Sequence, residues 1–461
     1  MALLRLFSSC CKLFVYLFIL VAVLDTTNKF VIAPVVDSLL CVLHLRTTIP
    51  IVEQETPTFA LDHAQALSAE QVIHLSQSDG TVGYPWRSSQ NILSLELGHS
   101  EPVLVDPNRI LSKIFSGSMY PTNIVPYFYR AKRSFNKDDI TITTLITSNR
   151  LEVFSRLVER YEGPISVTVH IKNKTEHIQE VLANLQELYV SSPKMASAVD
   201  VHIVVDAFDR QFNTWRNIAR LFARTDFVMM LDIDFYPCTD FSTLLQTNLI
   251  DGAIKKKMQD GRAALVVPAF EYLNFREGQN YSAFPSNKTD LLALVKARRI
   301  DMFHSSWGPG HNSTNYKKFY TAAPGEIYKV TRYQPAYEPY VIFKKDIPAW
   351  CDERFVGYGG NKAACLFEMY LAGVSYYVLS DHFIIHQNHR YEEKIREEER
   401  KHNRKVYLNF KEETCLRFLT RYHHYGVLRS SIAENALTEC KKIKSFVKLA
   451  PSSIQDALSM V

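Results

Sequence analysis

The stretch from Phe227 to Asp234 reads FVMMLDID, an uninterrupted apolar run followed by two carboxylates. A run of this kind is expected of a strand that is buried on both faces of a parallel sheet. At the carboxyl end of such a strand the sheet opens into its ligand crevice. Because an extended chain has a side-chain period of two, we expect Asp232 and Asp234 to project to one side while Ile233 points into the core.

Three β-branched runs precede this stretch, and helical patterns separate them. The predicted strands are 140–147 (ITITTLIT), 165–171 (ISVTVHI), 199–205 (VDVHIVV) and 227–231 (FVMML), and the helical candidates are 151–161, 175–188 and 213–223. This alternation predicts βαβ units with four parallel strands. The expected fold class is therefore α/β with a Rossmann-like, nucleotide-binding sheet.

Two carboxylates on one side of a strand end can share a divalent cation, and their hard oxygens suit Mg²⁺ or Mn²⁺. His386 ends the apolar run FIIH and is the candidate third ligand, with His389 as the alternate. An imidazole beside two carboxylates favours Mn²⁺. Taken singly, a DxD pattern is also typical of a polar strand end or turn, and His386 of an ordinary histidine.

The N-terminus indicates the compartment. Residues 13–24 (LFVYLFILVAVL) are apolar throughout and follow Arg5 and Lys12, which predicts a signal anchor with type II topology and a lumenal body. A cleaved signal peptide is the alternative. We expect a single-pass protein of the Golgi or endoplasmic reticulum membrane. Sequons compatible with a lumenal body occur at Asn173, Asn280, Asn287 and Asn312.

The expected organisation has four parts. Residues 1–24 form a cytosolic tip and anchor, 25–135 a stem or an irregular N-terminal subdomain, 136–425 the catalytic domain and 426–461 a C-terminal extension. The charged segment 391–405 predicts a solvated helix, to which we assign no chemistry. Of eight cysteines, Cys10 and Cys11 lie in the anchor, and the pairing of the other six stays open. The net charge of +5 does not imply a nucleic-acid partner.

A divalent cation beside a nucleotide-binding sheet can neutralise the diphosphate that leaves a sugar nucleotide, which predicts glycosyl transfer. The residues also carry a family resemblance. NTWRNIAR (213–220) and RTDFVMMLDID (224–234) resemble the family 49 glycosyltransferases, which include a β-1,4-glucuronyltransferase and the C-terminal domain of LARGE. YEPYV (337–341), DERFVGYGGNK (352–362) and FIIH (383–386) are similar to later blocks of that family, in the same order.

This resemblance implies a GT-A fold, a UDP-sugar donor with glucuronate preferred, a glycan or glycoprotein acceptor, Mn²⁺ dependence and inversion at the anomeric carbon. It implies the metal triad Asp232, Asp234 and His386. The donor-binding residues implied are Asn213, Arg216, Asn217 and Asp232. A loop near the donor or acceptor is implied for His311, and in this interpretation Gly359 and Gly360, with Asn361 after them, would let the backbone approach the sugars. Trp307 is a candidate for stacking on a sugar ring, with a buried Trp as the alternative.

An inverting transfer needs a base that takes the proton of the acceptor hydroxyl. Many GT-A enzymes place an acidic pair where this chain has Asn361-Lys362. The base is therefore unassigned, with Asp352, Glu353 and Glu368 as weak candidates; Asp352 or Glu353 could instead pair with Arg354. The alternatives to a transferase are a non-catalytic glycan-binding protein of the same fold, and a metal-dependent phosphoesterase or a glycosidase.

Overall fold

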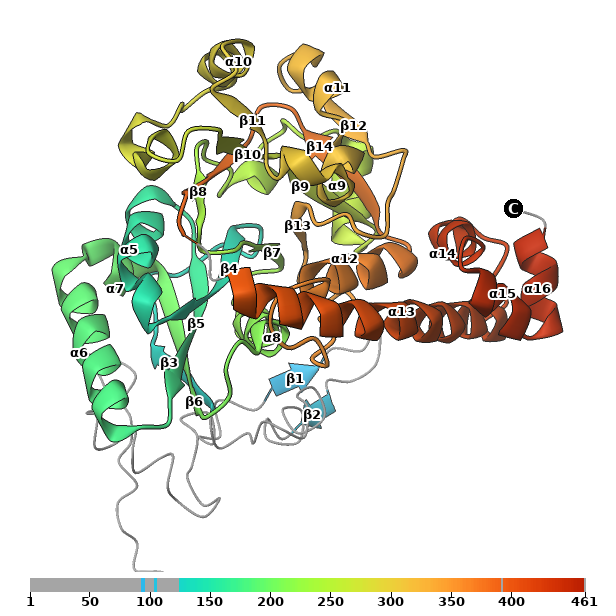
Figure 1. Ribbon diagram of the computed structural model, residues 1–461, viewed down its shortest axis with the longest axis horizontal. Helices are drawn as coiled ribbons and strands as arrows, with labels where there is room; N and C mark the ends of the chain where they lie inside the picture. Colours follow the sequence, from blue (N-terminus) through green and yellow to red (C-terminus); the bar gives the residue numbers. More distant parts are fainter. Residues whose placement is uncertain (1–92, 96–102, 106–123, 391–392, 460–461) are drawn as a thin grey trace, which may run out of the picture. The chain divides into compact units, whose positions relative to one another are not determined.

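The computed structural model describes residues 93–95, 103–105, 124–390 and 393–459, and Figure 1 shows their elements. The predicted anchor and most of the predicted stem lie outside the described residues. Within the described ranges, no helix is long and apolar enough to cross a bilayer.

A nine-stranded mixed sheet forms the centre of the fold, in the spatial order β12-β14-β9-β13-β7-β4-β5-β6-β3. Its strands are β3 (Ile124–Tyr129), β4 (Ile140–Thr147), β5 (Ile165–Lys172), β6 (Val199–Asp206), β7 (Phe227–Met230), β9 (Ala263–Val267), β12 (Ile327–Lys329), β13 (Tyr340–Lys344) and β14 (Ser375–Leu379). The four strands predicted from the sequence are confirmed as β4 to β7, and the pairs that they form with one another (β4 with β5, β4 with β7, β5 with β6) are all parallel.

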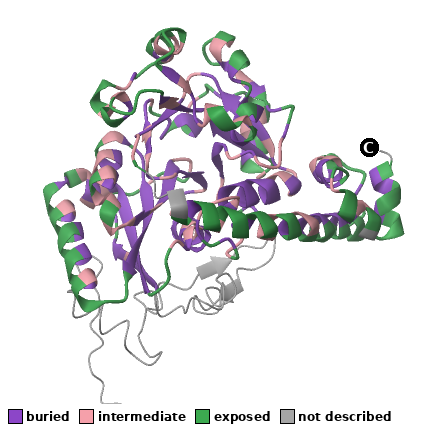
Figure 2. Ribbon diagram, in the orientation of Figure 1, coloured by how far each residue is buried: buried purple, intermediate pink, exposed green. Residues whose placement is uncertain are grey.

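The central strands are buried on both faces, as the apolar run at Phe227 predicts. Phe227 and Met229 of β7 face a core shared with α5 (Leu151–Arg160) and α6 (Thr175–Ser191). Val228 and Met230 face the opposite core, which includes side chains of α12 (Asn361–Leu371). Alternate residues of one strand therefore serve two cores, which is why the run contains no polar residue. Figure 2 shows the strands as the most continuously buried part of the described chain.

Two features of the sheet differ from the expected organisation. β3 lies within the range predicted as stem, and it pairs antiparallel with β6 at the edge of the sheet. β13 pairs antiparallel with both β7 and β9, so a strand from much later in the chain lies beside the central strand. Neither feature follows from βαβ periodicity.

A second sheet, in the order β11-β10-β15-β8, adjoins the carboxyl end of β7. It consists of β8 (Phe235–Pro237), β10 (Ala269–Tyr272), β11 (Ile300–Met302) and β15 (Ile384–His386). A separate pair is formed by β1 (Leu93–Leu95) and β2 (Val103–Val105). Because β8 follows Asp234 directly and pairs with β15, the second sheet brings His386 to the end of β7.

The remaining helices are α7 (Pro193–Ala198), α8 (Phe212–Leu221), α9 (Gly252–Gln259), α10 (Lys288–Lys296), α11 (Tyr316–Thr321), α13 (Glu393–His424), α14 (Glu434–Cys440), α15 (Lys444–Leu449) and α16 (Ser452–Ser459). The last four belong to the C-terminal part of the chain. Apolar side chains of α14 to α16 join the same core as α12, so residues 426–459 pack as part of this domain. Disulfides link Cys351 to Cys365 and Cys415 to Cys440, and Cys238 is a buried thiol.

Candidate functional site

The two carboxylates after β7 lie on a turn. The backbone N–H of Phe235 donates to the carbonyl of Asp232 at 3.1 Å, and Ile233 is buried as predicted. An extended chain would send Asp232 and Asp234 to one side, but this reversal directs them to different partners. The predicted alternation of burial is present, since Ile233 is buried and both aspartates are partly exposed, but the turn gives the two carboxylates different partners.

Asp232 lies between two cations. Its Oδ1 accepts from Arg216 of α8 at 2.9 Å, and its Oδ2 accepts from Lys362 of α12 at 3.0 Å and from the hydroxyl of Tyr340 at 2.9 Å. Burial would raise the pKa of this carboxyl, but Lys362 and Arg216 and the hydrogen bonds they donate together lower it well below its usual value. These two cations therefore favour the ionised form of Asp232.

Asp234 belongs to a second group. One oxygen of its carboxylate and one ring nitrogen each of His386 and His389 all lie within 4.8 Å of one another. His389 Nε2 is 3.1 Å from Asp234 Oδ2, and Arg150 Nη1 is 3.5 Å from Asp234 Oδ1. The residue predicted as alternate, His389, is thus part of this group, and the structure places Asp232 in the neighbouring cluster instead.

One carboxylate oxygen and two imidazoles fit a divalent transition metal such as Mn²⁺. Burial lowers the pKa of His386 to about 4, so this ring is neutral at physiological pH, which is the form that binds metal. Its Nδ1 lies 3.3 Å from Asn388 Oδ1, a contact of the kind that orients a ligating ring. The described residues therefore fit the metal that the sequence predicts.

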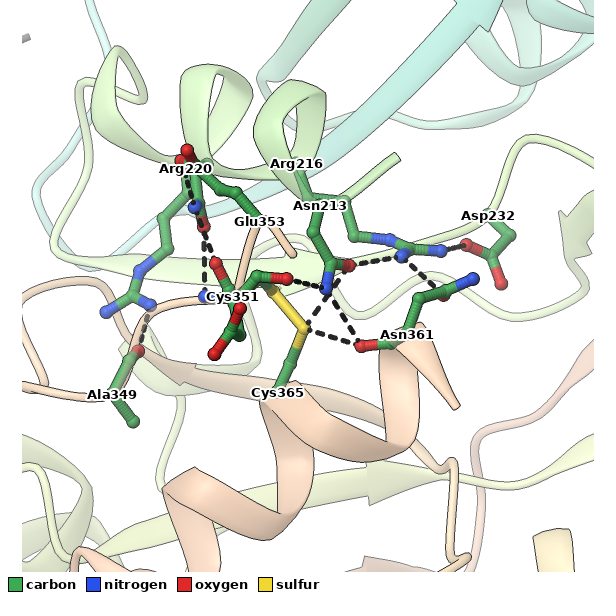
Figure 3. Close-up of a disulfide and its surroundings, with 11 residues drawn as sticks. Asn213, Arg216, Arg220, Asp232, Ala349, Cys351, Glu353, Asn361 and Cys365 are labelled. Carbon is green, nitrogen blue, oxygen red and sulfur yellow. Dashed lines mark hydrogen bonds and ion pairs between the residues drawn. A yellow bond between two sulfur atoms is a disulfide. The ribbon is translucent and has the colours of Figure 1, made fainter. Parts of the chain in front are cut away.

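Arg216 is held in place by two asparagines (Figure 3). Its Nη1 donates to Asn213 Oδ1 at 2.9 Å and to Asn361 Oδ1 at 2.8 Å, while Nη2 bonds to Asp232. Asn213 and Asn217 are almost completely buried, and their amides bond to the backbone of the segment from Cys351 to Asn361. Of the three donor-binding residues predicted on α8, the structure therefore leaves Arg216 nearest the site and places both asparagines behind it.

The three candidate bases are engaged elsewhere. Asp352 forms an ion pair with Arg354 at 2.7 Å, as the sequence alternative proposed. Glu353 accepts from Asn217 at 3.1 Å. Glu368 is buried on α12 and pairs with Arg417 of α13 at 2.9 Å. Asp352 and Glu368 thus form ion pairs with arginines that belong to neither the Asp232 nor the Asp234 group.

The loop residues differ in exposure. Trp307 is 51% exposed and lies against Gly310, so its ring is available to a ligand. His311 is buried; burial first, and then the nearby charge of Lys362, lower its pKa well below the usual value. Trp307 therefore fits a loop at the margin of the site, whereas His311 has an interior position.

The glycines before α12 face helix α13. Gly357 and Gly359 have φ angles of +77° and +97°, and a Cβ on Gly359 would lie 3.0 Å from the backbone of Arg400. Glu399 accepts from the backbone N–H of Tyr358 at 2.9 Å, and Asn403 donates to the carbonyl of the same residue at 2.8 Å. The close approach that Gly359 permits is made by helix α13, so the charged segment to which no chemistry was assigned supports this loop. The expectation that Gly359 and Gly360 let the backbone approach the sugars stays a prediction.

Sequence reasoning missed three groups. Arg150 lies three residues after the end of the strand 140–147, a position at the carboxyl end of the sheet that could have identified it. Tyr340 and Glu338 lie in the block YEPYV; Glu338 accepts from the backbone N–H of Ala363, close to Lys362 and Asp232. Burial raises the pKa of Glu338 above its usual value. No local pattern distinguishes Glu338 from a surface acid, because its neighbours come from α8 and α12.

A pocket of about 200 Å³ adjoins Asp234. Its lining combines two arginines with amides and an imidazole: Arg150, Val153, Arg156, Asp234, Gln279, Gln387, Asn388 and His389. Such a lining suits an anionic, hydrogen-bonding ligand. A cationic pocket at the carboxyl edge of a parallel sheet is typical of the nucleotide-binding α/β class.

The family follows from comparison with known proteins. The family model described as "Glycosyl-transferase for dystroglycan" matches residues 139–212 and 207–419, more than half of the chain. The chain therefore belongs to glycosyltransferase family 49, and the resemblance found in the sequence is confirmed.

Curated relatives agree with this assignment. The chain is 33% identical over 256 residues to the xylosyl- and glucuronyltransferase LARGE2 of Rattus norvegicus, covering 54% of this chain and 34% of the relative. It is 26% identical over 322 residues to LARGE1 of Homo sapiens, covering 69% and 40%. The chain thus spans between a third and two fifths of the length of these relatives.

Solved structures are similar only at low scores. S. aureus TarS 1–349 in complex with UDP-GlcNAc aligns with a TM-score of 0.32 at 13% identity, over 69% of this chain and 83% of that one. GalNAc-T7 with UDP, GalNAc and Mn²⁺ aligns with a TM-score of 0.33 at 12% identity, over 56% and 47%. The family assignment rests on the sequence match.

Proposed function

We propose that the protein is a metal-assisted, inverting glycosyltransferase with a GT-A fold, which moves a sugar from a UDP-sugar to a hydroxyl of a glycan or glycoprotein. The observation that carries this proposal is the pair of charged groups at the end of β7. Asp234, His386 and His389 form one group, and Asp232 with Arg216 and Lys362 forms the other. Both lie just beyond the carboxyl end of β7, the edge of a parallel sheet at which α/β proteins bind nucleotides.

The chain's own cations suit the donor. Arg150, Arg216 and Lys362 approach the two carboxylates from three different elements, and they can neutralise the negative charge that develops on a departing diphosphate. Asp234, His386 and His389, with Asp232 as the further predicted ligand, would hold Mn²⁺ or Mg²⁺. A divalent cation supplies additional positive charge beside the leaving group when it is bound.

Glucuronate is the proposed donor sugar. The names of the relatives include glucuronyltransferase, and the guanidinium of Arg216 is suited to a carboxylate as well as to a phosphate. An acceptor hydroxyl would attack the anomeric carbon in a single displacement, which inverts its configuration. The base for that proton is unassigned.

The proposed location is the lumen of the Golgi or endoplasmic reticulum, with residues 1–24 as a type II anchor and the segment after it as a stem. Two disulfides in the described part of the chain support an oxidising compartment. The apolar run at residues 13–24 supports the anchor.

The test is UDP release by the full chain against a panel of UDP-sugars, with Mn²⁺ or with EDTA. We expect Mn²⁺-dependent release from one donor, loss of release in Asp234→Asn, and normal release in Asp251→Asn. Asp251 caps α9 from an exposed position, and asparagine caps equally well, so this variant is the matched control. Full activity of a folded Asp234→Asn protein would refute the site. Absence of both release and UDP binding would favour the glycan-binding alternative.

A further inference from the structure

The Cys351–Cys365 disulfide lies next to Asn213, which accepts a hydrogen bond from Arg216 (Figure 3). Cys351 belongs to the segment between β13 and α12, and Cys365 lies on the first turns of α12. Both cysteines are buried. The bridge therefore closes the segment that begins at Cys351 onto the helix that begins at Asn361.

Helix α8 binds the closed segment through side-chain amides. Asn217 exchanges two hydrogen bonds with the backbone of Cys351, donating to its carbonyl at 2.9 Å and accepting from its N–H at 3.1 Å. Asn213 donates to the carbonyls of Asp352 and Asn361 at 2.7 and 3.1 Å. Both ends of the segment, the disulfide end and the helix end, are thus held against one face of α8.

The same contacts orient the guanidinium that faces Asp232. Asn361 and Asn213 both accept from Nη1 of Arg216, which leaves Nη2 for Asp232. Asn361 in turn donates to the carbonyl of Gly357 at 2.7 Å. A shift of the segment would move Asn361, and Nη1 of Arg216 would lose one of its two acceptors.

We propose that the Cys351–Cys365 disulfide is a positioning element of the donor site, acting through Asn361 on Arg216. This inference rests on the proposed function, since it takes Arg216 to bind the donor. The disulfide touches no ligand in this proposal. It maintains the geometry of a charged side chain, as groups behind a binding residue commonly do.

The second disulfide provides a matched control. Cys415–Cys440 joins α13 to α14, with a sequence separation of 25 residues against 14 for Cys351–Cys365. Loop-closure entropy predicts a slightly larger stabilisation for the longer loop. If both bridges served only to stabilise the fold, removing Cys415–Cys440 should lower the stability and the donor affinity at least as much as removing Cys351–Cys365 does.

The experiment compares the full-length Cys351→Ser/Cys365→Ser and Cys415→Ser/Cys440→Ser proteins with the wild type. Affinity for UDP and for UDP-glucuronate is measured by calorimetry with Mn²⁺, and stability by urea unfolding. We expect UDP-glucuronate or UDP to bind about 10-fold more weakly to the first variant, and within about 2-fold of wild type to the second. Equal donor affinities in the two variants would overturn the inference. Absence of UDP binding by the wild type would overturn the proposed function and the inference with it.

A second route avoids any folding defect of the first variant. In the Cys415→Ser/Cys440→Ser protein, Cys351–Cys365 is the remaining disulfide of the described residues, and dithiothreitol can reduce it after folding. Thiol labelling reports the reduction. We expect donor affinity to fall about 10-fold on reduction and to recover on reoxidation. In a protein that also carries Asn361→Ala, reduction of the disulfide should cause no further loss of donor affinity. Unchanged affinity after verified reduction, or fully additive losses with Asn361→Ala, would overturn the inference.

Discussion

The two acidic residues after β7 have different surroundings, and this difference predicts different effects of the same substitution. Arg216 and Lys362 are 10% and 6% exposed, and both pair with Asp232, so this carboxylate compensates two nearly buried cations. Asp234 has Arg150 and His389 as partners at the edge of a pocket. We therefore expect Asp232 to contribute to stability and Asp234 to contribute chiefly to ligand binding.

Asp232→Asn is expected to lower the free energy of unfolding by about 2 kcal/mol, because two cations lose the anion to which they donate hydrogen bonds. Asp209→Asn is the comparison, since Asp209 pairs with Lys172 on the surface with nearly half of each side chain exposed. We expect a change of roughly 0.5 kcal/mol or less there. Urea unfolding of both variants measures the difference. Equal effects would contradict the stabilising role of Asp232 between Arg216 and Lys362.

His202 gives a prediction for acid stability. It is fully buried; its Nδ1 accepts from the backbone N–H of Tyr127 at 3.0 Å and its Nε2 lies 3.0 Å from the hydroxyl of Ser166. A proton on Nδ1 would remove that acceptor. Burial first, and then the charge of Arg224, lower the pKa of His202 from 6.5 to about 3.

In the unfolded chain, His202 is protonated below about pH 6.5. In the folded protein it stays neutral down to about pH 3. The stability contributed by neutral His202 is complete above pH 6.5 and is lost as the pH falls through this window, with a slope of up to about 1.4 kcal/mol per pH unit. His202→Asn keeps an acceptor for Tyr127 but does not titrate. Urea unfolding between pH 7 and pH 4 should show a shallower pH dependence for this variant; parallel curves would contradict the assignment.

At the scale of elements, helix α13 determines the conformation of the loop before α12. Glu399 and Asn403 bond to the loop backbone, and Arg400 approaches Gly359 closely. A 32-residue helix with a weak apolar face would be expected to lie in solvent, and Figure 2 shows that much of its surface does. The contacts with the loop backbone come from Glu399, Arg400 and Asn403, whereas later residues such as Phe410 and Phe418 join the core that includes α12.

Gly359→Ala tests this packing against a glycine with similar backbone geometry. Gly325 has a φ of +76° with no atom within 4 Å of a built Cβ, whereas Gly359 has a φ of +97° and a Cβ position 3.0 Å from backbone. Both alanines incur the left-handed penalty of about 1 kcal/mol. Only Gly359→Ala must also displace α13, so we expect its thermal midpoint to fall further. Equal decreases of the thermal midpoint for the two variants in differential scanning calorimetry would show that α13 moves to accommodate the added Cβ at no cost in stability.

The elements themselves were predictable to different degrees. The strand 140–147 matches β4 exactly in its bounds because its β-branched run ends where Ser148 begins a turn, and the helix at 151–161 matches α5 to within one residue. β3 and β13 were not predicted, since each lies outside the βαβ alternation and pairs antiparallel with strands far away in the sequence. Periodicity reports which face of an element is buried, and it carries no information about a distant partner.

At the scale of the whole molecule, the sequence pattern likewise identifies residues of the site but not their distant partners. Asp232, Asp234 and His386 could be selected because each follows an apolar run, and that position implies the edge of a sheet. Their separation into two groups depends on a turn at Asp234 and on cations from α8, α12 and η3 (Ser148–Arg150), which only the folded chain brings together. The buried role of Asn213 and the partners of Glu368 likewise follow from tertiary contacts.

The proposed function predicts that ligands stabilise the domain as a unit. At 100 times its dissociation constant, UDP with Mn²⁺ should add about 2.7 kcal/mol to the free energy of unfolding. EDTA should remove this increment, and Asp234→Asn should show none of it. Thermal unfolding of the full chain with UDP and Mn²⁺, alone and together, measures the effect. An equal increment with and without EDTA would exclude a metal contribution.

The position of β13 has a consequence for synthesis of the chain. β13 (Tyr340–Lys344) occupies the edge of β7 that faces away from β4, and β9 is joined to β7 only through it. Until β13 leaves the ribosome, the nascent chain presents β7 as an unpaired apolar edge, which is a template for aggregation. Nonsense products that end before Tyr340 should therefore accumulate as insoluble protein and depend on chaperones. The same edge is closed in every chain that extends beyond Lys344.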